Sequence, residues 1–140
     1  VSDPYLPIYG NKVIGVREGK LDMHGVKRLR TWTEMEKTEE AGATKITLRE
    51  EVDWVAGEYI AIAPTDFEVD HAEKRKIVSI DKTNKDKPVV TLDKALEYKH
   101  FAETQYFGDD KKDFIDMRAE VGLLSRNVVY RGDPETSKKN

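Results

Sequence analysis

The sequence contains no cysteine. This absence excludes disulfide bonds, thiolate metal sites and a cysteine nucleophile from the 140-residue chain. A β-rich domain with a continuous apolar interior does not need such crosslinks. The sequence also contains no Asn-x-Ser/Thr acceptor for N-glycosylation, because Asn11, Asn84 and Asn127 all lack a hydroxyl residue two positions later.

Long hydrophobic runs are missing as well. No apolar stretch approaches the ~20 residues of a membrane-spanning helix, and no charged-then-apolar leader opens the chain. The 24 Lys and Arg are outnumbered by 27 Asp and Glu, which gives a net charge of -3. A basic footprint for nucleic acid is therefore not expected. We predict partners other than nucleic acid and no membrane insertion by this segment.

Strand patterns dominate the residues that are present. Apolar and polar side chains alternate with a period of two, which is typical of strands with one buried and one solvated face. The segments are 46–48, 60–62, 78–80, 90–92 and 115–121, with shorter candidates at 13–16 and 128–130. Helical patterns are poor. The sequence therefore predicts an all-β fold in a single domain.

Polar runs separate the predicted strands. Residues 82–87 (KTNKDK) lie between two strands and indicate the tip of a β-hairpin, and residues 109–113 (DDKKD) indicate a second exposed turn. Residues 133–140 contain no apolar side chain that could attach them to a core, so we predict a polar tail.

One acidic loop is a candidate metal site. Asp66, Glu68 and Asp70 alternate along it and offer the carboxylate oxygens that Ca²⁺ prefers. The glycine of a typical calcium loop and the glutamate at its end are missing, so a solvated loop is the alternative. The sequence makes calcium a possible ligand and indicates no other cofactor.

Glycan contact is the other chemistry that the residues suggest. The exposed faces of Trp32 and Tyr106 could stack on sugar rings, and Arg118 could bind a sugar carboxylate. Asp116 and Glu120 lie on the polar face of one predicted strand, but their spacing is too wide for a retaining glycosidase pair. Arg118 between them could simply form ion pairs. We assign no catalytic residue.

Several stretches together resemble the eight-glycine domain, and the start of the right-handed β-helix that follows it, in the fibrocystin-like family. They cover most of residues 7–132 in a specific order: YGNK at 9–12, GKLDMHG at 19–25, TWT at 31–33, VDWVAGEYI at 52–60, IAPTDF at 62–67, LEYKH at 96–100 and IDMRAEVGLLSRN at 115–127.

The resemblance implies a particular architecture. We expect an eight-glycine-type domain over residues 1–132, with right-handed parallel β-helix rungs at about 7–25 and 114–132. A small β-barrel-like insertion would occupy about 44–100, and the polar tail 133–140 would follow. Open ends of such rungs would contact other β domains of the same parent chain or assembly partners.

The resemblance also implies a function. We expect a non-catalytic module of an extracellular or cell-surface protein, with a scaffold, adhesion or assembly role and possible glycosaminoglycan contact. The alternative is a piece of a hyaluronan-type glycan-depolymerising enzyme, since some members of the family act on hyaluronan. A groove lined by Trp32 or Tyr106 with nearby Asp and Arg would favour the enzyme.

Overall fold

The computed structural model describes residues 14–125 and 128–132. The chain divides into two compact units, Lys27–Ser125 and Val1–Val26 with Arg126–Asn140, and every strand among the described residues lies in the first of them. In the described part of the chain, no helix is long and apolar enough to cross a membrane. The only helical element in this part of the chain is the short 3-10 turn η1, Val69–His71.

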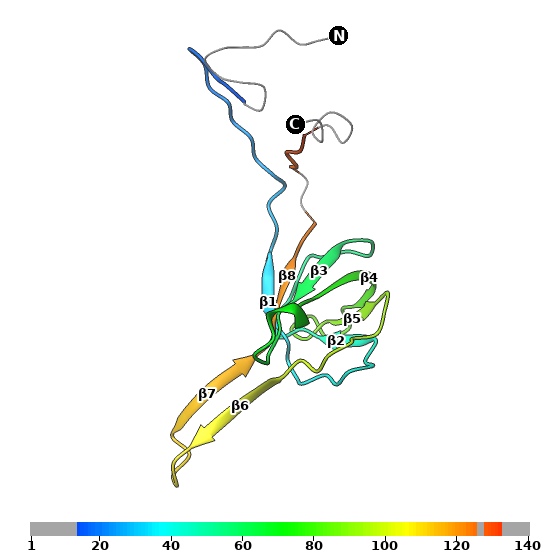
Figure 1. The fold of residues 1–140 in the computed structure, drawn as a ribbon, viewed down its shortest axis with the longest axis vertical. Helices are drawn as coiled ribbons and strands as arrows, with labels where there is room; N and C mark the ends of the chain where they lie inside the picture. The colour runs from blue at the N-terminus through cyan, green and yellow to red at the C-terminus, as the bar shows by residue number, and fades with distance from the viewer. Residues whose placement is uncertain (1–13, 126–127, 133–140) are drawn as a thin grey trace. The chain divides into compact units, whose positions relative to one another are not determined.

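A six-stranded antiparallel sheet forms the body of the larger unit (Figure 1). Its strand order is β1-β8-β3-β4-β5-β2. The bounds are Trp32–Glu34 for β1, Lys45–Thr47 for β2, Tyr59–Ile62 for β3, Glu73–Asp81 for β4, Val89–Leu92 for β5 and Glu120–Leu123 for β8. The alternation at 46–48, 60–62, 78–80 and 90–92 thus predicted strands that are present.

The sheet curls into a half barrel. Its two edge strands approach each other where Met35, just after β1, forms a bridge with Leu48, just after β2. The Glu36 N–H donates to the Thr47 carbonyl at 2.9 Å, and the Arg49 N–H donates to the Glu34 carbonyl at 2.9 Å. These bonds satisfy backbone groups that an open sheet edge would leave unpaired.

The core lies inside this curl. Trp54 is fully buried, and its Nε1 donates to the Arg30 carbonyl at 2.8 Å. The other core residues come from five strands of the sheet, all but β1, from the start of β6 (Ala102–Phe107) and from the connecting segments: Met35, Ile46, Leu48, Val52, Ile60, Ile62, Ile77, Val90, Leu92, Leu96, Ala102, Ala119, Val121 and Leu123. Burial of this apolar set is the main stabilising term of the fold.

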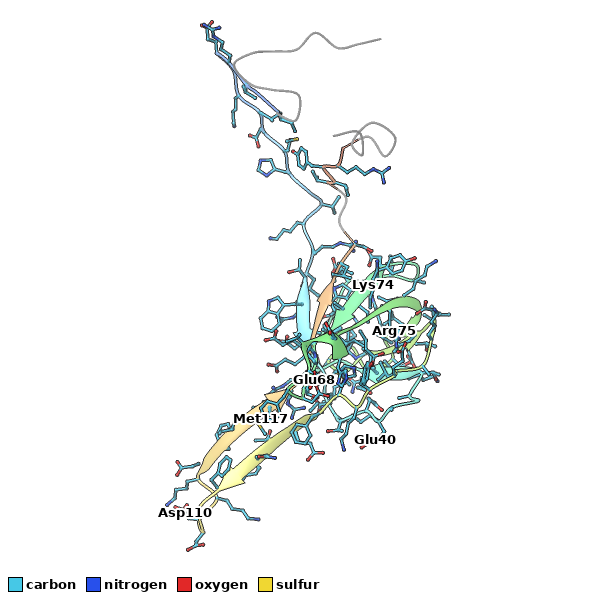
Figure 2. The ribbon with its side chains drawn as sticks, viewed as in Figure 1. Glu40, Glu68, Lys74, Arg75, Asp110 and Met117 are labelled. Atoms are coloured by element: carbon cyan, nitrogen blue, oxygen red, sulfur yellow. The ribbon has the colours of Figure 1, made fainter. Side chains whose placement is uncertain are left out.

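A two-stranded hairpin extends from the curled sheet (Figure 1). It consists of β6, Ala102–Phe107, and β7, Asp113–Arg118, and it pairs antiparallel in register from Ala102 opposite Arg118 to Phe107 opposite Asp113. The polar run that predicted a turn forms its tip, where Asp110 is labelled in Figure 2. The run 82–87 likewise joins β4 to β5.

The predicted parallel β-helix rungs are wrong for the described residues. Every strand pairing within them is antiparallel, both between successive strands such as β4 and β5 and between distant strands such as β1 and β8. The segment 115–121 is not one strand: it breaks at Ala119, and β7 and β8 join different sheets. The strands within 44–100 belong to the same sheet as β1 and β8.

The second unit has no strand in its described residues. Residues 14–26 and 128–132 are extended or bent, with exposed apolar side chains such as Val26 and Val129. The predicted strands at 13–16 and 128–130 are therefore absent wherever the structure describes them. Residues 7–13 of the first predicted rung, Val13 among them, lie outside the described residues, as does the polar tail 133–140.

Candidate functional site

The three predicted glycan-contact residues lie in different places. Trp32 begins β1 on the outer face of the six-stranded sheet, and its side chain is 57% exposed. Tyr106 lies near the tip of the β6–β7 hairpin and is 59% exposed. Arg118 ends β7 at the base of the hairpin. Within the described residues, no hydrogen bond or ring contact joins Trp32 to either of the other two.

Arg118 is occupied by structural contacts. Its Nη1 donates to the Met35 carbonyl at 3.2 Å and also to the Glu36 carbonyl, and its Nε pairs with Asp116 Oδ1 at 2.7 Å. Arg49 Nη1 holds the other carboxylate oxygen of Asp116 at 2.5 Å. This network fastens the base of the hairpin to the segments that follow β1 and β2.

The electrostatics of Asp116 agree with this role. Burial raises the pKa of the Asp116 carboxyl, but hydrogen bonds from Arg49, Arg118 and Thr104 outweigh burial and leave the pKa below its usual value. A carboxylate held in its ionised form by two guanidinium groups is a poor proton donor. Glu120 lies on β8 in the other sheet, so the two carboxylates do not share a strand.

The three candidate calcium ligands surround η1 without forming a site. Asp66 Oδ1 accepts the Glu68 N–H at 3.0 Å, and Asp66 Oδ2 lies 2.6 Å from His71 Nδ1. The hydrogen bond with His71, followed by that from the Glu68 N–H, lowers the pKa of Asp66. Across residues 14–125 and 128–132, no group of three or more His, Cys, Asp or Glu could hold a metal ion.

A shallow hollow of about 440 Å³ lies where this loop meets the hairpin. Tyr98, which stacks on His71 with ring centroids 3.7 Å apart, forms part of its wall. Gln105 and Met117 enter from β6 and β7, and Met117 is labelled in Figure 2. Neither Trp32 nor Tyr106 lines the hollow, so it is not the groove that would favour a glycan-cleaving enzyme.

Apolar side chains are exposed on both faces of the β6–β7 hairpin. Tyr106 lies opposite Phe114 on one face, with ring centroids 6.0 Å apart. Phe107 and Ile115 lie on the other face, and all four are exposed. The apolar/polar alternation located β7, but sequence reasoning expected its apolar residues to face a core. Sequence analysis singled out Tyr106 alone and missed the hairpin as a candidate contact surface.

A buried charged cluster was also missed. Glu73, Arg75 and His100 are all buried at the rim of the core. Glu73 pairs with Arg75 and accepts the backbone N–H groups of Glu97 and Tyr98 at 2.9 and 3.0 Å. His100 Nε2 lies 2.9 Å from Glu73 Oε1. The signal was the period-two position of Glu73 and Arg75, which share the inward face of β4 with Ile77.

Comparisons with known proteins identify the sequence family. The G8 domain family matches residues 1–36. Fibrocystin-L of Mus musculus is 42% identical over 134 residues, which are 94% of this chain, and fibrocystin-L of Homo sapiens is 38% identical over the whole chain. A G8 domain-containing protein of Dictyostelium discoideum is 26% identical over 97% of the chain.

The matched region is a small part of these relatives. It spans 3% of either fibrocystin-L and 8% of the Dictyostelium protein. The structure adds that this region forms antiparallel β-sheet throughout its strands. The chain is therefore a G8-domain segment of the fibrocystin-like family, homologous to a short stretch of fibrocystin-L.

Proposed function

We propose that the chain is a non-catalytic extracellular β module of a larger fibrocystin-like surface or secreted protein, with a role in scaffolding, adhesion or assembly. The match over nearly the whole chain to about 3% of fibrocystin-L supports one module within a long protein. Such modules function through contacts with their neighbours.

The exposed β6–β7 hairpin is the observation that carries this proposal. An isolated two-stranded hairpin is only marginally stable in water. Here Tyr106 and Phe114 expose one apolar face, and Phe107 and Ile115 expose the other. Apolar surface of this kind marks a contact site more often than a solvated one. Its outer strand edges can also pair with a further strand.

We propose a neighbouring β domain of the same parent protein as the partner of this hairpin. The network of Arg118, Asp116 and Arg49 fixes the base of the hairpin, so the hairpin is presented in a defined direction from its sheet. A preformed contact element loses little conformational entropy on binding. The absence of a free carboxylate pair at Asp116 and Glu120 supports a non-catalytic role.

The test is binding between this chain and the adjoining segment of its parent, measured by calorimetry. Changing Tyr106 and Phe114 together to serine should weaken binding at least tenfold, because aromatic residues at interface centres contribute about 2 kcal/mol or more. Val78→Ser is the matched control, since Val78 is exposed on β4, outside the hairpin. Equal affinities for both variants would refute the proposed contact.

A further inference from the structure

Exposed apolar side chains gather on the outer face of the six-stranded sheet. The strand register places Trp32 of β1 opposite Gly122 of β8, and Gly122 opposite Ala61 of β3. Residues that are directly opposite point to the same face of a sheet. The alternation of faces along β3 and beyond the end of β8 places Tyr59 and Leu124 on this face as well, and the Leu124 N–H donates to the Tyr59 carbonyl at 2.8 Å. Trp32, Tyr59 and Leu124 are all exposed, and such a patch marks a contact site.

Two lysines of β4 border this outer face. Lys74 lies opposite Ala61, and Lys76 lies opposite Tyr59. Their ammonium groups lie 4.7 and 5.9 Å from the centroid of the Tyr59 ring. Among the described residues neither lysine forms an ion pair, whereas Arg75 between them points inward to a buried carboxylate. Figure 2 labels Lys74 and Arg75 on this strand. The face therefore carries two cations that lack an acidic partner.

Two glutamates occupy the diagonally opposite corner of the outer face. Glu34 and Glu120 lie opposite each other, two residues along β1 and β8 from Trp32 and Gly122. They lie on the side of that row that is away from Tyr59. The Glu34 carboxylate pairs with Arg49 at 2.7 Å, but Glu120 forms no ion pair within the described part of the chain. Cations and anions thus lie at opposite corners, with the apolar side chains between them.

This arrangement is self-complementary under a two-fold rotation. Adjacent strands are about 4.8 Å apart, and residues on one face repeat about every 6.8 Å along a strand. With these spacings, a second copy can be placed face to face about a diagonal axis that passes beside Gly122. The pairs that then meet across the two copies are Lys74 with Glu120, Lys76 with Glu34 and Trp32 with Tyr59. Each pair occurs twice, as the symmetric interface of a two-fold dimer requires.

Small residues beside the axis let the two sheets approach each other. A Cβ atom added to Gly122 would meet no atom within 4 Å, and Gly122 does not have positive φ, so no local constraint requires glycine there. Glycine in a strand interior often marks a place where another backbone approaches closely. Ala61, opposite Gly122, is also small. The large rings of Trp32 and Tyr59 can therefore stand on either side of the axis and pack against the second copy.

We propose that the outer face binds a second copy of this chain in a symmetric dimer. Burial of Trp32 and Tyr59 supplies the apolar contact, and Lys74 gains the acidic partner that its own copy does not provide. From β1 to β4 the face has a footprint of about 200 Å². A stable interface buries ~800 Å² per partner, so this dimer is weak and dissociates readily. The face is separate from the β6–β7 hairpin, so either proposal can fail alone.

The test is sedimentation equilibrium of the whole chain at low salt, up to millimolar concentrations. Lys74→Glu and Glu120→Lys, made separately, should each weaken self-association about tenfold or more, because like charges then meet and the two-fold axis makes each change count twice. An equimolar mixture of the two variants should regain association, since the reversed charges again meet opposite charges across the interface. Lys85→Glu, at an exposed position between β4 and β5, is the control and should associate like the unchanged chain.

Loss in both variants with recovery in their mixture would support the dimer, and a folding defect would not produce that recovery. A chain that stays monomeric, variants that associate like the control, or loss without recovery would each overturn it. Loss of association when Tyr106 and Phe114 are changed to serine would assign the contact to the hairpin instead. A monomeric chain whose binding to the adjoining segment of its parent is weakened by Lys74→Glu would assign the face to a domain of the parent.

Discussion

Glu73 is the residue whose removal should damage the fold most through electrostatics. Its side chain is only 2% exposed and pairs with Arg75 and with His100, both themselves buried. It also accepts the backbone N–H groups of Glu97 and Tyr98, which lie in the segment between β5 and β6. The substitution Glu73→Ala would leave two N–H donors without their acceptor, and it would leave the buried Arg75 only Glu97, at 3.4 Å, as an ionic partner.

The expected cost follows from what is left behind. Removing one partner of a buried ion pair costs about 3–5 kcal/mol, because the other charge stays in a poorly solvated position. The orphaned N–H groups add to this, since each unsatisfied buried donor costs about 1–3 kcal/mol unless water reaches it. Against a typical total stability of about 5–15 kcal/mol, Glu73→Ala should bring the domain close to unfolding.

Urea denaturation, followed by the fluorescence of buried Trp54, measures this loss. Glu51→Gln is the control, because Glu51 is exposed and forms no ion pair within the described part of the chain. We expect a change of about 0.5 kcal/mol or less for the control and at least 3 kcal/mol for Glu73→Ala. A loss of less than 1 kcal/mol for Glu73→Ala would refute the reasoning that the cluster is buried and mutually dependent.

Further predictions test other parts of the account. Burial raises the pKa of Glu73, but its hydrogen bonds and Arg75 outweigh burial and hold the pKa below 4.5. The contribution of Glu73 to the free energy of unfolding should therefore be complete above pH 4.5 and disappear as the pH falls. In denaturation curves recorded at several pH values, Glu73→Gln should reduce this loss of stability in acid. Arg118→Met should speed amide exchange in residues 102–118 and leave β3 to β5 protected, whereas uniform acceleration would contradict a local anchor. In thermal melts, Gly57→Ala should lower the free energy of unfolding by about 1 kcal/mol or more, because the φ of Gly57 is 93°. Gly122→Ala should be neutral or slightly stabilising, because Gly122 has no positive φ and its added Cβ has space. Equal effects of the two substitutions would contradict the left-handed conformation assigned to Gly57.

Local patterns predicted the strands well because each strand contributes one face to the core. The alternation around Ile46, Ile60 and Val90 required no knowledge of distant partners. The polar run 82–87 contains turn-forming residues and joins two strands, as predicted.

Pairing between distant segments could not be read in the same way. The alternation over 115–121 continues through Ala119. No local pattern shows that β7 belongs to the hairpin and β8 to the six-stranded sheet. The parallel β-helix followed from the family resemblance and not from the alternation, which is compatible with either pairing direction. Antiparallel pairing depends on which strands the turns bring together.

Prediction of the candidate sites was limited for the same reason, because the sequence does not show which distant residues lie side by side. Trp32 was singled out for its type, but Gly122 and Ala61, which lie beside it on the sheet, are far away in the sequence and become its neighbours only through the strand register. Arg118 was a reasonable glycan ligand in isolation. Its guanidinium is instead occupied by carbonyl groups from the segment after β1, a contact that no local pattern indicates.

The central claim is that this segment of the fibrocystin-like family is non-catalytic. The most direct test is incubation of the chain with hyaluronan of defined length, with and without calcium, followed by measurement of polymer size. The account predicts unchanged polymer length under both conditions, whether or not the polymer is bound. Shortening of the polymer that is abolished by Asp116→Asn would contradict the account and locate a catalytic site at the base of the hairpin.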